Sequence, residues 1–261
     1  MKKVAIIQAR MESKRLPGKV MKKLGDFTVI SFLLERLSNS KNIDEIVIAI
    51  PNNKENLDLY SHLKEMGYAV FRGEKDNVLN RYYKAAKQYK ADIVVRITGD
   101  CPFVDPELVD KLIEFFEESK VDYVSNILPP TYPDGMDVEV FSEEALRKSE
   151  ALCTNTEERE HVTSFIINNP DFSKKNFEND IDYSYLRWTL DEIEDYELMT
   201  EINKNFDNIH FTFSNILQLV MSKNNLQNIN KHLYRNEGSL LNDSQKLWKR
   251  AKKVIPGGNM L

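Results

Sequence analysis

The sequence predicts an α/β fold built on a parallel β-sheet. Three short runs, at residues 3–9, 44–50 and 91–98, are rich in Val and Ile and alternate only weakly, as strands covered on both faces do. Segments with helical spacing of apolar residues separate them, and this strand–helix alternation is typical of a parallel sheet. The chain has 261 residues, of which 41% are hydrophobic, so it can bury a sizeable core.

The helices expected in the first half follow from apolar spacing and from one clear start signal. In residues 29–37 the apolar positions recur at i, i+3, i+4 and i+7, and residues 53–66 and 77–90 are amphipathic as well. A fourth helix is expected to begin at Pro106, because this proline follows Asp105, which is a good capping residue.

The pattern changes after residue 120. Short strands are expected at residues 121–125, 136–141 and 185–189, and helices at residues 142–152, 156–168, 194–205 and 214–222. We interpret residues 1–222 as one domain with an inserted β/α element at about residues 123–170. Residues 223–261 are polar at first and then basic, and they are interpreted as a peripheral tail.

Charge and cysteine content narrow the classes of function. The net charge of −5 argues against general nucleic-acid binding. Residues 1–23, however, hold eight Lys or Arg and a single acidic residue, Glu12, so this opening indicates a local site for a small anion. No apolar run approaches the length of about 18 residues that a membrane span needs. Two cysteines, Cys101 and Cys153, are too few for a disulfide framework and fit a cytoplasmic location.

The loop after the first expected strand is the first candidate for a binding site. Its cations Arg10, Lys14, Arg15 and Lys19 lie within ten positions, where open α/β sheets bind ligands. Like charges this close repel one another unless an anion is present, and Arg and Lys together suit a triphosphate. The loop has neither the Gly-rich run of a Walker A motif nor the spaced glycines of a dinucleotide fingerprint. A solvated basic loop is the alternative interpretation.

Two acidic positions follow later strands and could hold a hard cation. Gly99 allows a close backbone approach at the end of the third expected strand, and Asp100 comes directly after it. Asp100 could instead be a turn residue that caps the next helix, although Asp105 is the better candidate for that cap. Asp191 follows the expected strand at residues 185–189 and could complete a magnesium site. Alternatively, Asp191 and the acidic residues next to it only enrich the first turn of a helix in negative charge.

Taken in order, these motifs resemble those of the sugar-acid cytidylyltransferases, which make CMP-sialic acid and CMP-Kdo, and in particular the SpsF-type branch of spore-coat polysaccharide proteins. The resemblance lies in residues 7–19, 73–83, 96–106, 132–142, 158–163 and 186–195, and it spans about residues 3–240. It implies a GT-A-like nucleotide-diphospho-sugar transferase fold, with a mixed, mostly parallel sheet flanked by helices. It also implies CTP as donor, Mg²⁺ as cofactor, and Asp100 and Asp191 as the metal positions.

The resemblance assigns further roles to individual residues. The expected catalytic residues are Arg10, Lys14, Arg15, Lys19 and Asp100, and the expected nucleotide-binding residues are Gln8, Ala9, Arg10, Lys19, Arg81, Arg96 and Gly99. The expected acceptor-binding residues are Asp137, Glu139, His161 and Arg187. Asp137 and Glu139 alternate, so both would face one side of a strand. A structural histidine is an equal alternative for His161. Arg96 and Thr98 flank Ile97 where the sialate and Kdo enzymes usually carry a Gln, so the resemblance leaves the acceptor's identity open.

The expected reaction is attack of an acceptor oxygen on the α-phosphorus of CTP, with pyrophosphate as the leaving group. The acceptor is expected to be a sugar acid of the nonulosonic type, used for a surface or spore-coat polysaccharide. A homodimer is expected, without nucleic acid or membrane as partner. Two alternatives stay open. One is a nucleotidyltransferase of the same fold that acts on a sugar phosphate or another acceptor, and the other is a non-catalytic nucleotide-binding sensor.

The end of the chain has a resemblance of its own. Residues 244–258 combine helical spacing of apolar residues with a final Ile-Pro-Gly-Gly, and they resemble the opening of class III aminotransferases of the glutamate-semialdehyde type. This implies that residues 223–261 comprise a polar tail and the stub of a following aminotransferase-like domain. A basic tail that docks on the acidic body is the alternative.

Overall fold

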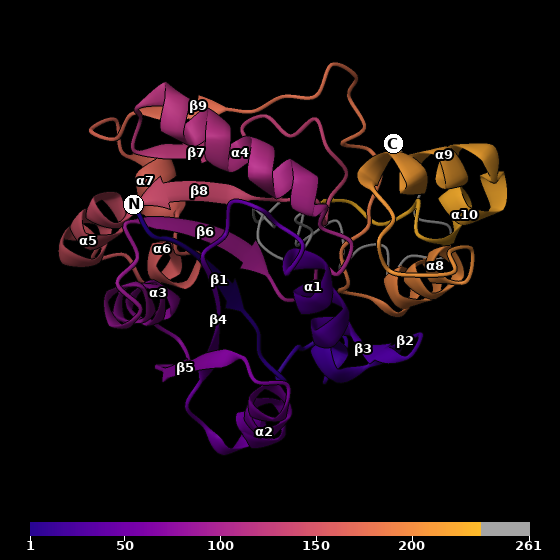
Figure 1. Ribbon diagram of the computed structural model, residues 1–261, viewed down its shortest axis with the longest axis horizontal. Helices are drawn as coiled ribbons and strands as arrows, with labels where there is room; N and C mark the ends of the chain where they lie inside the picture. Colours follow the sequence, from indigo (N-terminus) through magenta and orange to yellow (C-terminus); the bar gives the residue numbers. More distant parts are fainter. Residues whose placement is uncertain (236–261) are drawn as a thin grey trace, which may run out of the picture.

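A computed structural model describes residues 1–235, which fold around a seven-stranded sheet (Figure 1). The strand order is β5-β4-β1-β6-β8-β7-β9, with β1 at Lys3–Gln8, β4 at Glu45–Pro51, β5 at Ala69–Gly73, β6 at Ile93–Thr98, β7 at Tyr123–Ser125, β8 at Glu139–Ser142 and β9 at Lys174–Asn176. Strands β5, β4, β1 and β6 are parallel neighbours, whereas β8 is antiparallel to both β6 and β7. The predicted mixed, mostly parallel sheet is therefore confirmed.

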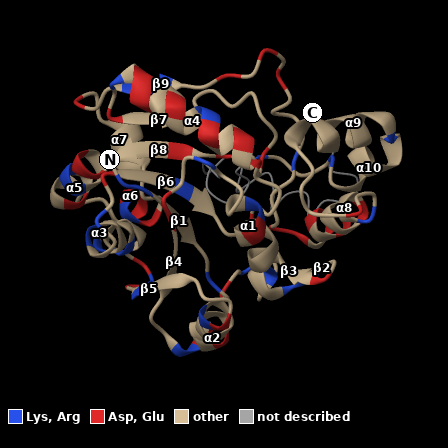
Figure 2. Ribbon diagram, in the orientation of Figure 1, with Lys and Arg blue, Asp and Glu red and all other residues tan. Residues whose placement is uncertain are grey.

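Helices cover both faces of this sheet, which explains why its strands read as nearly continuous apolar runs. On one face the buried residues of α1 (Val29–Leu37), α2 (Leu57–Glu65) and α4 (Pro106–Ser119) join those of alternate strand positions in one core cluster. On the other face α3 (Val78–Gln88) and α5 (Glu143–Leu152) contribute to a second cluster. In Figure 2 the helices carry most of the charged segments and the middle of the sheet is mostly tan.

The predicted start of α4 is confirmed by its cap. The side chain of Asp105 accepts a hydrogen bond from the backbone N–H of Glu107, and Pro106 occupies the first helical position. The same carboxylate also accepts from the backbone N–H of Phe213, which begins α9 at Phe213–Ser222. Because Asp105 makes these contacts, it ties the helix that follows β6 to the C-terminal part of the chain.

Two local predictions are wrong, and two short strands were not predicted. Residues 156–168 form two short helices, α6 at Thr156–Glu160 and α7 at Ser164–Asn168, because the backbone turns at Val162, whose φ is +60°. Residues 185–189 do not form a strand and make one isolated bridge, between Arg187 and Asp134. Strands β5 and β9 were not anticipated, because both are short and lack a run of buried apolar residues.

The remaining described elements are helices, turns and one hairpin outside the main sheet. They are α8 at Ile193–Asn203, α9, α10 at Asn224–Ile229, the small hairpin of β2 (Lys23–Leu24) and β3 (Phe27–Thr28), and the 3-10 turns η1 at Lys19–Met21 and η2 at Lys54–Asn56. Figure 1 shows α8, α9 and α10 grouped at one end of the molecule, beyond the arrowhead of β6. None of the helices in residues 1–235 is both long enough and apolar enough to cross a membrane.

The domain limits stay predictions, but the structure adds contacts beyond residue 222. Leu226 of α10 is 2% exposed and the following Asn230 is 4% exposed, so this segment packs into the body of the protein. The proposed aminotransferase stub at residues 244–258 lies outside the described residues.

Candidate active site

The loops after β1 and β6 begin at the same edge of the sheet, because the two strands are parallel neighbours. The backbone N–H of Gly99 donates to the carbonyl oxygen of Gln8 at 2.8 Å, which joins the two loops at their origin. A Cβ atom at position 99 would lie 3.0 Å from the Ala9 Cβ and from the Gln8 carbonyl oxygen. Glycine therefore permits the close approach that places Asp100 beside the basic loop.

Lys19 lies between the two acidic residues that were predicted as metal ligands. Its Nζ is 2.5 Å from Asp100 Oδ2 and 2.8 Å from Asp191 Oδ1, and its side chain is only 10% exposed. Burial alone would raise the pKa of Asp100, but the adjacent ammonium outweighs burial and lowers this pKa to about 2. Burial would likewise lower the pKa of Lys19, and the two carboxylates raise it. The resting site therefore holds Lys19 and Asp100 charged at neutral pH.

The other cations of the basic loop differ in their contacts. Arg15 forms ion pairs with Asp191 Oδ2 at 2.8 Å and with Glu192 Oε1 at 3.2 Å, so it belongs to the same cluster as Lys19. Lys14 is exposed to solvent, and exposed Arg10 lies 4.0 Å from Glu160. The structure thus brings Arg15 and Lys19 to the acidic pair, and the roles of Arg10 and Lys14 stay predictions.

The basic loop is fastened by Glu12, which the sequence analysis did not assign to the site. Its carboxylate accepts from Asn53 Nδ2 and Asn56 Nδ2, both at 2.6 Å, and pairs with Lys75 Nζ at 2.8 Å. The fully buried Asn56 in turn accepts from the backbone N–H of Met11 at 2.9 Å. The available signal was the isolation of Glu12, which is the one acidic residue among the first 23.

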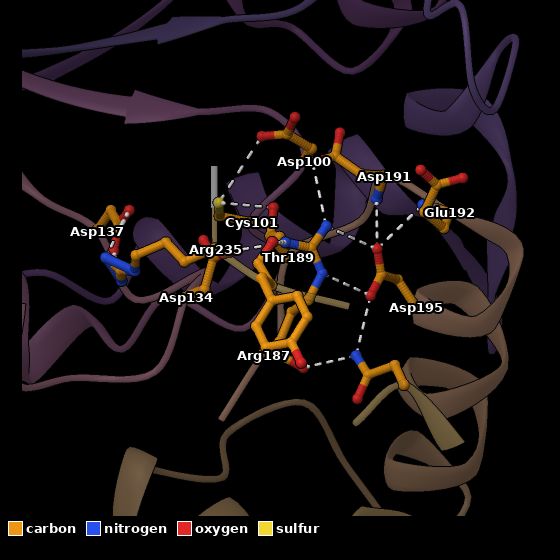
Figure 3. A network of polar contacts seen from close by, with 12 residues as sticks. Asp100, Cys101, Asp134, Asp137, Arg187, Thr189, Asp191, Glu192, Asp195 and Arg235 are labelled. Carbon is orange, nitrogen blue, oxygen red and sulfur yellow. Dashed lines mark hydrogen bonds and ion pairs between the residues drawn. The ribbon is translucent and has the colours of Figure 1, made fainter. Parts of the chain in front are cut away.

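Arg187 is placed behind Asp191, within a buried network of carboxylates (Figure 3). Its guanidinium donates to Asp134 Oδ2 at 2.8 Å, to Asp191 Oδ2 at 3.2 Å and to both oxygens of Asp195 at 2.9 and 3.0 Å. Because Arg187 is 6% exposed and these contacts engage all three of its nitrogens, it orients Asp191. Its predicted contact with the acceptor stays a prediction.

Two further residues complete this network and were missed by sequence reasoning. Asp195 Oδ2 accepts the backbone N–H groups of Asp191 and Glu192, both at 3.0 Å, at the start of α8. Asn230 Nδ2 donates to the Arg187 carbonyl oxygen and to Asp195 Oδ1, both at 2.9 Å. From the sequence, Asp195 was predicted only to be one of several acidic residues in the first turn of a helix. Nothing in the local sequence connects Asn230 with that turn.

Glu139 and Arg96 form a second buried ion pair, near the start of β8 and the end of β6. Glu139 is 2% exposed, and its Oε1 accepts from the Tyr123 hydroxyl and from Thr163 Oγ1, both at 2.6 Å. Burial alone would lower the pKa of Arg96, but Glu139 more than offsets this and raises it, while Arg96 Nη2 donates to Gln8 Oε1 at 3.2 Å. Glu139 therefore holds Arg96 and Gln8 at the strand ends, and its own oxygens are already engaged.

Asp137 faces a cation from the C-terminal segment. Arg235 Nη2 donates to Asp137 Oδ1 at 2.6 Å, and its Nη1 lies 3.5 Å from Oδ2. Burial raises the pKa of Asp137 to about 7, and the nearby Asp134 and Glu139 act in the same direction, while Arg235 and Arg96 oppose them. The side chain of Asp137 is 33% exposed, so this predicted acceptor residue is accessible.

Two predicted site residues make their contacts away from the acidic pair. Arg81 is 2% exposed and its Nη1 donates to the carbonyl oxygens of Glu74 and Lys75, so it shapes the loop that carries Lys75 to Glu12. His161 ends α6, and its carbonyl oxygen accepts from Thr163. Their assignments to nucleotide and acceptor stay predictions.

The donor set fits a magnesium ion that is shared with phosphates. Mg²⁺ is commonly bound by one or two carboxylates together with waters and substrate phosphates, and does not need a cage made by protein alone. Asp100 and Asp191 already bracket one cation, the Lys19 ammonium. Within residues 1–235 no group of three or more His, Cys, Asp or Glu residues gathers as a metal cluster. These two carboxylates are therefore the residues that could hold the ion.

A basic loop after the first strand and a carboxylate pair at the same sheet edge define a nucleotidyltransferase of the α/β class. The chain belongs to the cytidylyltransferase family, because the family model described as "Cytidylyltransferase" matches residues 4–239. The predicted enzyme class is thereby confirmed. Members of this family typically use a divalent metal ion.

Individual relatives agree with this assignment. The Spore coat polysaccharide biosynthesis protein SpsF of Bacillus subtilis is 36% identical over 202 residues, which cover 74% of this chain and 82% of that protein. The structure of a cytidylyltransferase from Leptospira borgpetersenii is similar with a TM-score of 0.84 at 34% identity, over 87% of this chain and 98% of that one. The structure of CMP:2-keto-3-deoxy-manno-octonic acid synthetase complexed with CTP shares the fold, with a TM-score of 0.63 at 16% identity over 79% of this chain and 100% of that one.

Proposed function

We propose that the protein transfers CMP from CTP to a sugar acid of the nonulosonic type and releases pyrophosphate, for the synthesis of a surface or spore-coat polysaccharide. The observation that carries this proposal is the cluster of Lys19, Asp100 and Asp191 at the edge where the basic loop begins. The name of the SpsF relative and the CTP bound in the CMP:2-keto-3-deoxy-manno-octonic acid synthetase structure support the same donor and pathway class.

The residues of the cluster divide the work of an in-line displacement. Arg15 and Lys19 would exchange their carboxylate partners for phosphate oxygens, and so neutralise the triphosphate and the departing pyrophosphate. Asp100 and Asp191 would hold Mg²⁺, which supplies charge neutralisation at the phosphates and lowers the pKa of the acceptor hydroxyl. Arg187 and Asp195 would keep Asp191 in position during this exchange. Positioning and charge neutralisation account for most catalysis of this kind.

A substrate matrix tests the proposal. Pyrophosphate release is measured with CTP, UTP, GTP or ATP, each against Kdo, N-acetylneuraminate and glucose 1-phosphate, in the presence of Mg²⁺. We expect release with CTP and a sugar acid. Release with glucose 1-phosphate instead would favour a sugar-phosphate nucleotidyltransferase, and CTP binding without any turnover would favour a sensor.

The proposed enzyme acts in the cytoplasm, where its nucleotide substrate is made. It is proposed to be a homodimer. Light scattering of the purified chain tests the oligomeric state, and a monomer at micromolar concentration would contradict it.

A further inference from the structure

Asp137 and Arg235 lie at the same sheet edge as the acidic pair, but on the side away from the basic loop. Strand β8 is antiparallel to β6, with Glu139 opposite Arg96, so the residues before β8 lie beside the end of β6. The basic loop follows β1, on the other side of β6. Figure 3 shows Asp137 and Arg235 on one side of Cys101, and Asp191 and Glu192 on the other. This position suits the acceptor, because the basic loop occupies the nucleotide side.

The surroundings of this position are acidic. Asp134 and Asp137 face it, and Asp100 and Asp191 lie beyond them, so an acceptor that carries a carboxylate would be repelled unless a cation met it. Other cations of the cluster are already engaged. Lys19 is shared by Asp100 and Asp191, and Arg187 donates to three carboxylates.

Arg235 differs from these cations because it has donor capacity to spare. Within residues 1–235 its single carboxylate partner is Asp137, and one of the two contacts is long, at 3.5 Å. Its Nη2 also donates to the Tyr132 carbonyl oxygen, at a similarly long 3.4 Å. Its Nε is buried and has no hydrogen-bond partner among the described residues. An incoming carboxylate could therefore form the paired, two-point contact that a guanidinium favours.

The bond between Arg235 and Asp137 is also one that the protein can release. Burial raises the pKa of Asp137 to about 7, and the nearby Asp134 and Glu139 act in the same direction, against Arg235 and Arg96. A partly exposed carboxylate in this position can take up a proton or turn toward solvent when another anion arrives. Asp137 thus acts as a stand-in for the anionic group of a ligand.

We infer that Arg235 binds the carboxylate of the sugar-acid acceptor, in exchange for Asp137. This inference rests on the proposed function and deepens it, because it names the residue that makes the enzyme specific for acids. Arg235 follows α10, so the C-terminal segment supplies part of the acceptor site and Arg235 is a substrate-binding residue.

The test compares Arg235→Ala and Arg235→Lys with the control Lys231→Ala, which removes an exposed cation from the same segment. Pyrophosphate release is measured with saturating CTP and varied Kdo or N-acetylneuraminate, and then with varied CTP. In Arg235→Ala we expect the KM for the acid to rise about tenfold to a hundredfold, as loss of a charge-assisted contact predicts, with the KM for CTP unchanged. Arg235→Lys should recover part of this loss, and Lys231→Ala should match the unchanged protein.

The possible outcomes separate this inference from the proposed function. An unchanged or lowered KM for the acid in Arg235→Ala would overturn the inference and leave the proposed function standing. Equal loss of affinity for acid and CTP, together with a lower melting temperature, would also overturn it, because Arg235 would then be structural. If the unchanged protein releases pyrophosphate with neither acid, the proposed acceptor class fails, and the inference fails with it.

Discussion

The two halves of the site are built by different means. In residues 1–105 the site residues lie in the loops that follow parallel strands, Lys19 after β1 and Asp100 after β6, and the strand ends place these loops together. In residues 123–235 they come from loops and helix ends that are far apart in sequence, as with Asp134, Arg187 and Arg235. The first half is therefore specified by local sequence, and the second by contacts between distant segments.

The difference matters because each half is incomplete alone. Lys19 from the first half pairs with Asp191 from the second, and Arg15 pairs with both Asp191 and Glu192. The acidic pair is thus the junction at which the two halves meet. Substitutions on either side of this junction measure how much each half contributes.

The largest effects are expected for Asp100→Asn and Asp191→Asn, which remove one carboxylate from each half. We expect each to lower Mg²⁺-dependent pyrophosphate release by about a hundredfold or more, because each takes a charge from the site where transition-state charge is neutralised. Circular dichroism should show an unchanged fold. Near-normal turnover in either variant would remove that residue from the metal site, and a loss confined to Asp100→Asn would place the catalytic charge in the first half alone.

The next effect concerns stability and compares one glycine from each half. Gly135 has φ of +104°, and a Cβ atom there would lie 2.4 Å from the backbone of Trp188. Gly67 has φ of +83° with nothing within 4 Å of such an atom. We expect Gly67→Ala to lower the free energy of unfolding by about 1–2 kcal/mol through backbone strain alone. Gly135→Ala should lower it by about 4 kcal/mol or more, because the Trp188 backbone cannot move away.

Chemical denaturation of both variants checks this pair. Equal losses would show that the loops at residues 133–136 and 186–189 can separate at little cost. In that case the second half would be more plastic than its close backbone contacts suggest.

The same distinction explains what could be predicted from the sequence. The strands β1, β4 and β6 carry a strong apolar signal, and so they and the residues just after them were placed correctly. Residues 185–189 have the composition of a strand, yet Gly135 lets another loop cross them, and this long-range contact overrides the local preference. Asn230 and Arg235 lie in a polar stretch of sequence, and the residues that they contact are far away along the chain. No local sequence pattern predicts such contacts, so this part of the site is seen only in the structure.

A smaller effect is expected in the basic loop. Lys14→Ala and Arg15→Ala should each weaken CTP binding by roughly 1.5–3 kcal/mol, which titration calorimetry in the presence of Mg²⁺ measures. Of these two cations, Arg15 is the one that contacts Asp191 and Glu192 among the described residues, so its removal should also change the response to Glu192→Ala in a double-mutant cycle. Unchanged CTP affinity in both single variants would mean that the loop is merely a solvated face.

The smallest effect is a pH dependence of stability that comes from the second half. Burial raises the folded-state pKa of Asp137 from about 3.8 to about 7. Asp134 and Glu139 also raise this pKa, whereas Arg235 and Arg96 oppose the rise. Between these two values the folded state binds more protons than the unfolded chain, so Asp137 makes stability decline as pH rises from about 4 to about 7. Asp137→Asn should reduce this decline in melting temperature between pH 5 and pH 7.5, whereas Asp207→Asn, at an exposed carboxylate, should not. An identical decline in both variants would contradict the assignment.

The contacts of Glu12 have a consequence for the entropy of binding. By joining Asn53, Asn56 and Lys75, Glu12 fixes the start of the basic loop during folding, before any nucleotide arrives. Ordering the backbone of a free loop costs about 1–2 kcal/mol of conformational free energy per residue. A ligand that had to order this loop would bind more weakly by the sum of that cost over the ordered residues. Here the ordering is completed by folding, so the backbone entropy of this part of the loop is not lost a second time when a triphosphate binds.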